Sequence, residues 1–188
     1  MRTHLHPFRH NTNPGVRGEN VKLHSRDLAL TAVFAALYAV GVLALAGISF
    51  EIVQVRVADA LIPLSMLFGW PVALGVTIGC AIANFASPLQ IPLAEITLGS
   101  TANLIASLLA WKIGKSKAMH KSISQLLGCL AATLAVTIIV GTYLSVLTGI
   151  GLWVWWLTIG AGSLVSICIL GYILVQIMSR IQPIPSAT

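Results

Sequence analysis

Apolar residues dominate the chain from residue 28 onward, and short polar breaks divide them into stretches that predict membrane-spanning helices. A helix that crosses a bilayer needs about 20 predominantly apolar residues. The first apolar run, residues 28–50, is too long for the apolar part of a signal peptide and predicts a retained span. We predict six spans in an all-α fold, at residues 28–48, 57–68, from 72 to a break at 87–92, then 93–111, 122–148 and 152–179.

A tight helical hairpin is predicted in the middle of the chain. The 35 residues between Asp59 and Glu95 carry no charge. This uncharged segment is too long for one span and short for two spans with a turn. Gly69-Trp70-Pro71 is the predicted break between the two helices, and Pro63 is predicted to kink the first of them. Because a hairpin returns to the side it left, its two charged flanks should meet on one side of the membrane.

The hairpin predicts a polar pocket. Arg56 and Asn84 are each 14 residues from Trp70, or roughly 21 Å from the turn at the α-helical rise. Ionisable residues inside a membrane cost about 2.5–3.5 kcal/mol each and commonly mark functional sites. The alternative for Arg56 and Asp59 is an i,i+3 ion pair that only neutralises itself. Glu95 has no cationic neighbour in sequence, and it shares one helix face with Gly99 and Asn103.

Composition supports an integral membrane protein of one domain. Hydrophobic residues make up 57% of the chain and charged residues 9%, against about 25% charged in soluble domains. We predict a polar, basic cytoplasmic tail at 1–26, a transmembrane domain at 27–180 and a short tail at 181–188. The net charge of +6 lies beside the spans, which suits cytoplasmic loops and anionic lipid, and no aromatic pattern suggests nucleic acid. Apart from Arg56, the lysines and arginines fall before the first span, between the fourth and fifth, and after the sixth, so both termini are predicted cytoplasmic and the polar pocket outward-facing.

Small and aromatic residues add three further predictions. One stripe of the first span carries Ala32, Ala35, Ala36 and Ala39, which predicts either docking of a partner helix or internal packing. Gly75, Gly79 and Ala83 form a nearly bare face that should pack against the second span or another neighbour. The tryptophans that open the last span predict an interfacial belt or, with Trp153 as the candidate, a stacking wall over a flat ligand.

Motifs of catalysis and nucleotide binding are absent from the sequence. There is no G-x-x-x-x-G-K-[ST], H-E-x-x-H or G-x-S-x-G pattern, and no histidine lies in a predicted span. We therefore predict that the chain is not an enzyme. The widely spaced Cys80, Cys129 and Cys168 are predicted to be small buried residues. His4 and His6 lie in the polar tail, and no metal site is predicted there or elsewhere.

Several of these segments resemble one transporter family. The resemblance covers about residues 29–110 and rests on Val53-Gln54-Val55-Arg56, Ala60-Leu61, the segment GCAIAN at 79–84 and the segment EITLGSTA at 95–102. These look like the queuosine-precursor S components, often called QueT, of energy-coupling-factor (ECF) transporters. The chain differs from the usual family pattern in having Asp59 in place of glutamate and Glu95 in place of aspartate.

The resemblance implies a membrane protein that captures a solute outside the cell. It implies a partner transmembrane T component and two ABC ATPases that hydrolyse ATP, so no cofactor is expected in this chain. The implied solutes are 7-deazaguanines such as 7-cyano- or 7-aminomethyl-7-deazaguanine, whose adjacent N–H groups suit a carboxylate. The predicted substrate-binding residues are Arg56, Asp59, Asn84, Glu95, Asn103 and Trp153, and the predicted partner-binding residues are the four alanines.

Three alternatives remain open at this level. The chain could be an S component for another vitamin-like heterocycle, or a stand-alone secondary transporter, which would need repeat symmetry or a proton relay that is not evident. It could also be a structural protein whose charges only pair with one another. All four hypotheses place it in the cell membrane as a multi-pass protein.

Overall fold

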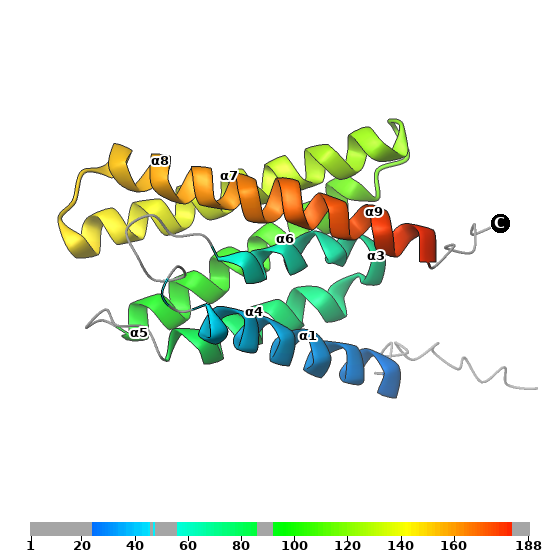
Figure 1. Ribbon diagram of the computed structural model, residues 1–188, viewed down its shortest axis with the longest axis horizontal. Helices are drawn as coiled ribbons and strands as arrows, with labels where there is room; N and C mark the ends of the chain where they lie inside the picture. The colour runs from blue at the N-terminus through cyan, green and yellow to red at the C-terminus, as the bar shows by residue number, and fades with distance from the viewer. Residues whose placement is uncertain (1–23, 46, 48–55, 86–91, 182–188) are drawn as a thin grey trace, which may run out of the picture.

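The computed structural model describes residues 24–45, 47, 56–85 and 92–181, and within these ranges the chain forms helices and no strand (Figure 1). The elements are α1 (Ser25–Ala44), η1 (Val57–Leu64), α3 (Ser65–Phe68), α4 (Trp70–Asn84), α5 (Pro92–Ala94), η2 (Glu95–Gly99), α6 (Ser100–Gly114), α7 (Lys121–Thr148), α8 (Leu152–Ser163), η3 (Leu164–Gly171) and α9 (Tyr172–Ile181). The tail predictions for 1–23 and 182–188, the connection that carries Glu51 and Gln54, and the break from Ser87 to Ile91 lie outside the described residues.

Within the described ranges, four helical segments have the length and composition to cross a membrane: Ser25–Ala44, Glu95–Gly114, Lys121–Thr148 and Leu152–Ile181. Two shorter apolar segments, Val57–Phe68 and Trp70–Asn84, lie among them. Large apolar side chains, such as Leu37, Ile138 and Ile169, are exposed on the outer surface of the bundle, as expected where lipid is the solvent. The prediction of an all-α fold is therefore confirmed for the described residues, and its long apolar helices are suited to a membrane.

The predicted hairpin turn is present at Gly69. Its φ of 75° is a left-handed value that favours glycine, and its N–H donates to the Ser65 carbonyl oxygen at 2.8 Å. Pro71 lies in the first turn of α4, where its missing N–H costs nothing. The second predicted turn, at 149–151, is also present, with Gly149 at φ 70° ending α7.

The segment that contains Pro63 differs from the kinked α-helix that was predicted. Residues Val57–Leu64 form a 3₁₀ helix, which rises about 2.0 Å per residue where an α-helix rises 1.5 Å. The α-helical estimate of the distance between Arg56 and the turn was therefore too short. The longer rise lets this short segment cover more of the bundle than its residue count suggests.

The described chain begins and finishes at the same end of the bundle (Figure 1). The start of α1, the connection from α6 to α7 and the end of α9 lie there, and we call it the basic end. It gathers the lysines and arginines of the described chain other than Arg56, which are Arg26, Lys112, Lys115, Lys117, Lys121 and Arg180. The start of η1, the end of α4 and the start of η2 lie at the opposite end.

Bare glycine positions bring α1 and α4 into close contact. A Cβ atom added to Gly79 would lie 2.5 Å from the Ala35 carbonyl oxygen and 2.8 Å from the Tyr38 Cβ. One added to Gly75 would meet Phe34 Cβ at 2.7 Å. The glycine face of α4 therefore packs against α1, the first predicted span. Of the two neighbours predicted from the sequence, the second span or another helix, the structure shows another helix.

The alanine stripe of α1 is divided between the interior and the surface. Ala35 and Ala39 are buried, whereas Ala32 and Ala36 are exposed. The four side chains therefore do not form one exposed face, and the partner-binding prediction is now restricted to Ala32 and Ala36. For Ala35 and Ala39, internal packing is the observed role.

Candidate functional site

Five of the six predicted substrate-binding residues are buried at the end of the bundle opposite the basic end. They come from the start of η1, the end of α4, and the continuous helix formed by η2 and α6. Their exposed fractions are Arg56 8%, Asp59 4%, Asn84 0%, Glu95 0% and Asn103 3%. Such burial of charged and amide side chains is expensive unless the groups find partners, so their contacts decide what the cluster can do.

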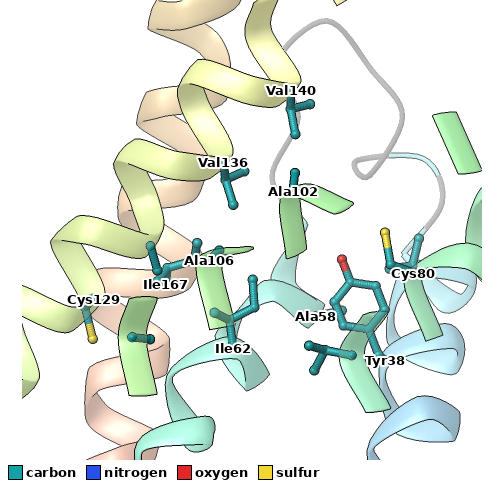
Figure 2. Close-up of a cluster of buried hydrophobic side chains, with 14 of the residues drawn as sticks. Tyr38, Ala58, Ile62, Cys80, Ala102, Ala106, Cys129, Val136, Val140 and Ile167 are labelled. Atoms are coloured by element: carbon teal, nitrogen blue, oxygen red, sulfur yellow. The ribbon is translucent and has the colours of Figure 1, made fainter. Parts of the chain in front are cut away.

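A hydrogen-bonded chain joins three helices through Tyr38. The Tyr38 hydroxyl donates to Asp59 Oδ1 at 2.6 Å and accepts from Asn103 Nδ2 at 2.8 Å. Figure 2 shows Tyr38 extending from α1 toward the centre of the bundle, with Cys80 beside it. This tyrosine was not predicted from the sequence, and it fixes the carboxylate and the amide in one position.

Arg56 lies beside the same chain of groups. Its Nη1 is 3.9 Å from Cys80 Sγ, a long and weak contact, and Asp59 is within its electrostatic range. The structure therefore places the two side chains near each other, and the ion-pair alternative stays a prediction. However, Asp59 also accepts a hydrogen bond from Tyr38, so the pair is built into a larger polar group.

A second set of polar groups surrounds Gly99 and contrasts with the first. Asn84 Nδ2 donates to the Glu95 backbone carbonyl oxygen at 2.8 Å. A Cβ atom added to Gly99 would lie 2.7 Å from that amide nitrogen and 3.6 Å from the Tyr143 hydroxyl. Neither carboxylate oxygen of Glu95 has a hydrogen-bond partner among the described residues, and the same is true of Asn84 Oδ1 and the Tyr143 hydroxyl.

The local backbone explains how Glu95 reaches the interior. Residues Glu95–Gly99 form a π-helical turn, a wide turn that is frequent at functional sites. Gly99 has no side chain, so the turn approaches the end of α4 closely enough for Asn84 to bond its backbone. The predicted face of Glu95, Gly99 and Asn103 does point inward, since all three residues are buried.

A small cavity adjoins the cluster. It has a volume of about 10 Å³ and is lined by Arg56, Asp59, Asn103, Val136, Val140, Ile159 and Ser163. That is room for about one water molecule, whereas sites for small organic ligands have about 300–1,000 Å³. A heterocycle could therefore enter only if the surrounding helices or side chains moved apart.

Trp153 does not join the cluster. Its side chain is 72% exposed and it packs edge-on against Trp156, with ring centroids 5.4 Å apart. The buried tryptophan is Trp155, one turn before the cavity-lining Ile159 on the same face of α8. Its Nε1 donates to Thr148 Oγ1 at 2.9 Å. The structure therefore places Trp153 outside the cluster, its role as a substrate contact stays a prediction, and Trp155 is the tryptophan that points to the interior.

The chemistry available here is recognition by hydrogen bonds and charge. Within the described ranges, no three histidine, cysteine, aspartate or glutamate side chains gather as metal ligands. Cys80 and Cys129 are buried and Cys168 is half-buried, and all three are free thiols. The cluster offers a carboxylate with open acceptor atoms, an amide oxygen, a hydroxyl and a guanidinium.

A helical membrane protein with a polar site inside the bundle is the class that this fold and cluster define, and solute transporters commonly have this plan. The chain belongs to the QueT transporter family, whose sequence pattern matches residues 28–180. Membership points to a role in transport rather than catalysis. No curated protein and no solved structure matched the chain.

Proposed function

We propose that the chain is the substrate-binding S component of an ECF-type importer and that it captures a 7-deazaguanine at the outer face of the cell membrane. The proposed solutes are queuosine precursors such as 7-cyano- or 7-aminomethyl-7-deazaguanine. Membership of the QueT transporter family supports a transport role. The remaining support comes from charge placement and from the chemistry of the buried cluster.

The single observation that carries the proposal is the open carboxylate of Glu95. It is fully buried, and neither of its oxygens has a partner among the described residues. An ionised carboxylate in that position is costly until two donors reach it. The guanine-like edge of a 7-deazaguanine carries a ring N–H beside an exocyclic amine, which matches two carboxylate oxygens in a bidentate arrangement.

The proposed topology has six membrane crossings with both termini in the cytoplasm. The four long segments and the two shorter apolar segments would each cross once. The basic end, with Arg26, Lys121 and Arg180 among its residues, would face the cytoplasm by the positive-inside rule. The polar cluster at the opposite end would then open to the outside.

The proposed partners are a transmembrane T component and two ABC ATPases. The sequence lacks the phosphate-binding G-x-x-x-x-G-K-[ST] loop, so the energy of ATP hydrolysis would have to come from other chains. In this scheme the present chain binds solute and membrane lipid, while its partners drive release into the cytoplasm.

Ligand capture tests the proposal directly. The purified protein should retain a 7-deazaguanine that mass spectrometry identifies after denaturation. Calorimetry should show that guanine-type ligands bind more tightly than a purine without the exocyclic amine, because that purine leaves one oxygen of Glu95 unpaired. Equal binding of the two ligand types would contradict recognition of the guanine-like edge.

Docking of the T component is expected to involve the exposed half of the alanine stripe. Replacing Ala36 with leucine adds bulk to an exposed position of α1 and should weaken complex formation or transport. Solute affinity of the isolated chain should stay within about twofold, a change of only a few tenths of a kcal/mol. Co-purification with the partner chains and calorimetry measure the two effects separately.

The matched control is Ala39→Leu, three residues further along the same helix. Ala39 is buried, so this variant should overpack the interface of α1 and lower stability as well as assembly. If Ala36→Leu abolished solute binding while assembly survived, the exposed alanines would serve the fold and not a partner.

A further inference from the structure

The polar atoms of the cluster fall into two groups: those that hydrogen-bond to one another and those that have no hydrogen-bond partner among the described residues. Tyr38, Asp59 and Asn103 hold one another through two hydrogen bonds. The carboxylate of Glu95, the amide oxygen of Asn84 and the hydroxyl of Tyr143 are buried without partners in the described part of the chain. Buried polar groups in native proteins are nearly always hydrogen-bonded. The second group therefore still needs hydrogen-bond partners.

We infer that Tyr143 is a substrate-binding residue and that its hydroxyl donates a hydrogen bond to a ring carbonyl of the solute. In the same complex, Glu95 and Asn84 accept hydrogen bonds from ring and amino N–H groups. The inference rests on the proposed function, because it assumes a flat heterocycle bound at this cluster. It adds a residue of α7 that the sequence did not single out.

Proximity supports the assignment. The Tyr143 hydroxyl and the Asn84 amide both lie within 4 Å of the same point above Gly99. Tyr143 is also within electrostatic range of Glu95 and Arg56. The three orphaned side chains come from α4, η2 and α7, so a ligand among them would bridge helices from both sides of the bundle.

Hydrogen-bond accounting decides which role Tyr143 has. An ionised carboxylate only accepts hydrogen bonds, and Asn84 already uses its amide nitrogen as a donor to a backbone carbonyl, which leaves its oxygen as an acceptor. The tyrosine hydroxyl is the one member of this group that can donate. A ligand that presents N–H groups to Glu95 and Asn84 and also carries a carbonyl would therefore use the hydroxyl of Tyr143.

The cavity lies on the same face of α7. Val136 and Val140 line it, and Tyr143 follows at the next turn of that helix face. A ligand that widened the cavity toward the end of the bundle opposite the basic end would meet Tyr143 next. Tyr38 does not offer the same chemistry, because its hydroxyl already donates to Asp59.

The test compares Tyr143→Phe with the wild-type chain on two ligands measured by calorimetry. The ligands are 7-deazaguanine and its 6-thioxo analogue, which keeps the N–H groups but replaces the carbonyl oxygen with a poor acceptor. For 7-deazaguanine, the variant should lose about 5- to 15-fold in affinity, because a buried carbonyl loses its donor. For the thioxo analogue, the loss should be below about twofold, since little hydrogen bonding is removed there.

Each outcome distinguishes a separate failure. An equal loss of affinity for both ligands would show that the Tyr143 hydroxyl supports packing. No loss of affinity for either ligand would show that the carbonyl is bound elsewhere. Either result overturns the inference while the proposed function stands. A wild-type chain that bound neither ligand would overturn the proposed function and the inference with it. Tyr172→Phe, which removes the hydroxyl of a half-buried tyrosine outside the cluster, should leave both affinities unchanged.

Discussion

Glu95→Gln should weaken binding of a 7-deazaguanine by roughly 10- to 150-fold. The substitution nearly preserves volume but replaces one acceptor oxygen with a donor amide. It removes one charge-assisted hydrogen bond, which is worth about 1.5–3 kcal/mol. Titration calorimetry of wild-type and variant chains in the same detergent measures the change.

The stability of the ligand-free protein separates recognition from a structural role. Because no described residue pairs with the Glu95 carboxylate, Glu95→Gln should leave the melting temperature without ligand unchanged or raise it. A lower melting temperature with affinity held within about twofold would instead mean that Glu95 serves the fold through a pairing. Glu95→Asp keeps the charge and should cost less affinity than Glu95→Gln.

Gly79→Ala should destabilise the protein by about 1–3 kcal/mol, the usual range for overpacking a tight interface. The added Cβ would lie 2.5 Å from the Ala35 carbonyl oxygen, which is backbone and cannot turn away. Relief requires α1 to move from α4, and Tyr38 moves with α1. We therefore expect a lower melting temperature together with weaker solute binding, since the hydrogen bond from Tyr38 to Asp59 would be disturbed.

Gly160→Ala is the matched control for this substitution. Gly160 also lies in a helix, but its added Cβ would meet only Thr137 side-chain atoms at 3.4 and 3.5 Å, which is ordinary contact. Alanine is the better helix former by up to about 1 kcal/mol, so this variant should be as stable as the wild type or slightly more stable. Equal melting temperatures for the two variants would show that α1 and α4 are not tightly packed at Gly79.

The turns and the charged part of the site could be predicted because the sequence is mostly apolar. Against that background, Gly69-Trp70-Pro71 and the glycines near 150 are strong breaks, and Arg56, Asp59 and Glu95 stand out as costly charges. Asn84 and Asn103 followed from helix spacing relative to these positions. All five residues are buried in the same cluster.

The two tyrosines could not be found in the same way. Tyrosine is common in apolar helices, so neither Tyr38 nor Tyr143 differs visibly from its neighbours in sequence. Their hydroxyls matter because α1 and α7 pack beside η1 and η2, and this arrangement depends on tertiary contacts. No periodicity within a single helix specifies which distant helices lie next to it.

For the tryptophans and the alanines, the structure differs from the sequence-based expectation in helix phase. Residues at positions 153 and 155 point to different sides of a helix, and only tertiary packing decides which side is internal. The stripe of four alanines on α1 covers about 100° of the helix circumference. The boundary between interior and surface runs through the middle of that arc, so the pattern alone could not place it.

Tyr38 gives α1 a direct connection to the polar cluster. Only one residue separates it from the exposed Ala36, while its hydroxyl holds Asp59 and Asn103. A shift of α1 against its neighbours would therefore move one hydroxyl and change two polar side chains at once. If a partner pulls on the exposed face of α1, its binding free energy and that of the solute become linked. Linkage is reciprocal. A bound solute would therefore change the affinity of the chain for its partner by the same factor by which the partner changes the affinity of the chain for the solute.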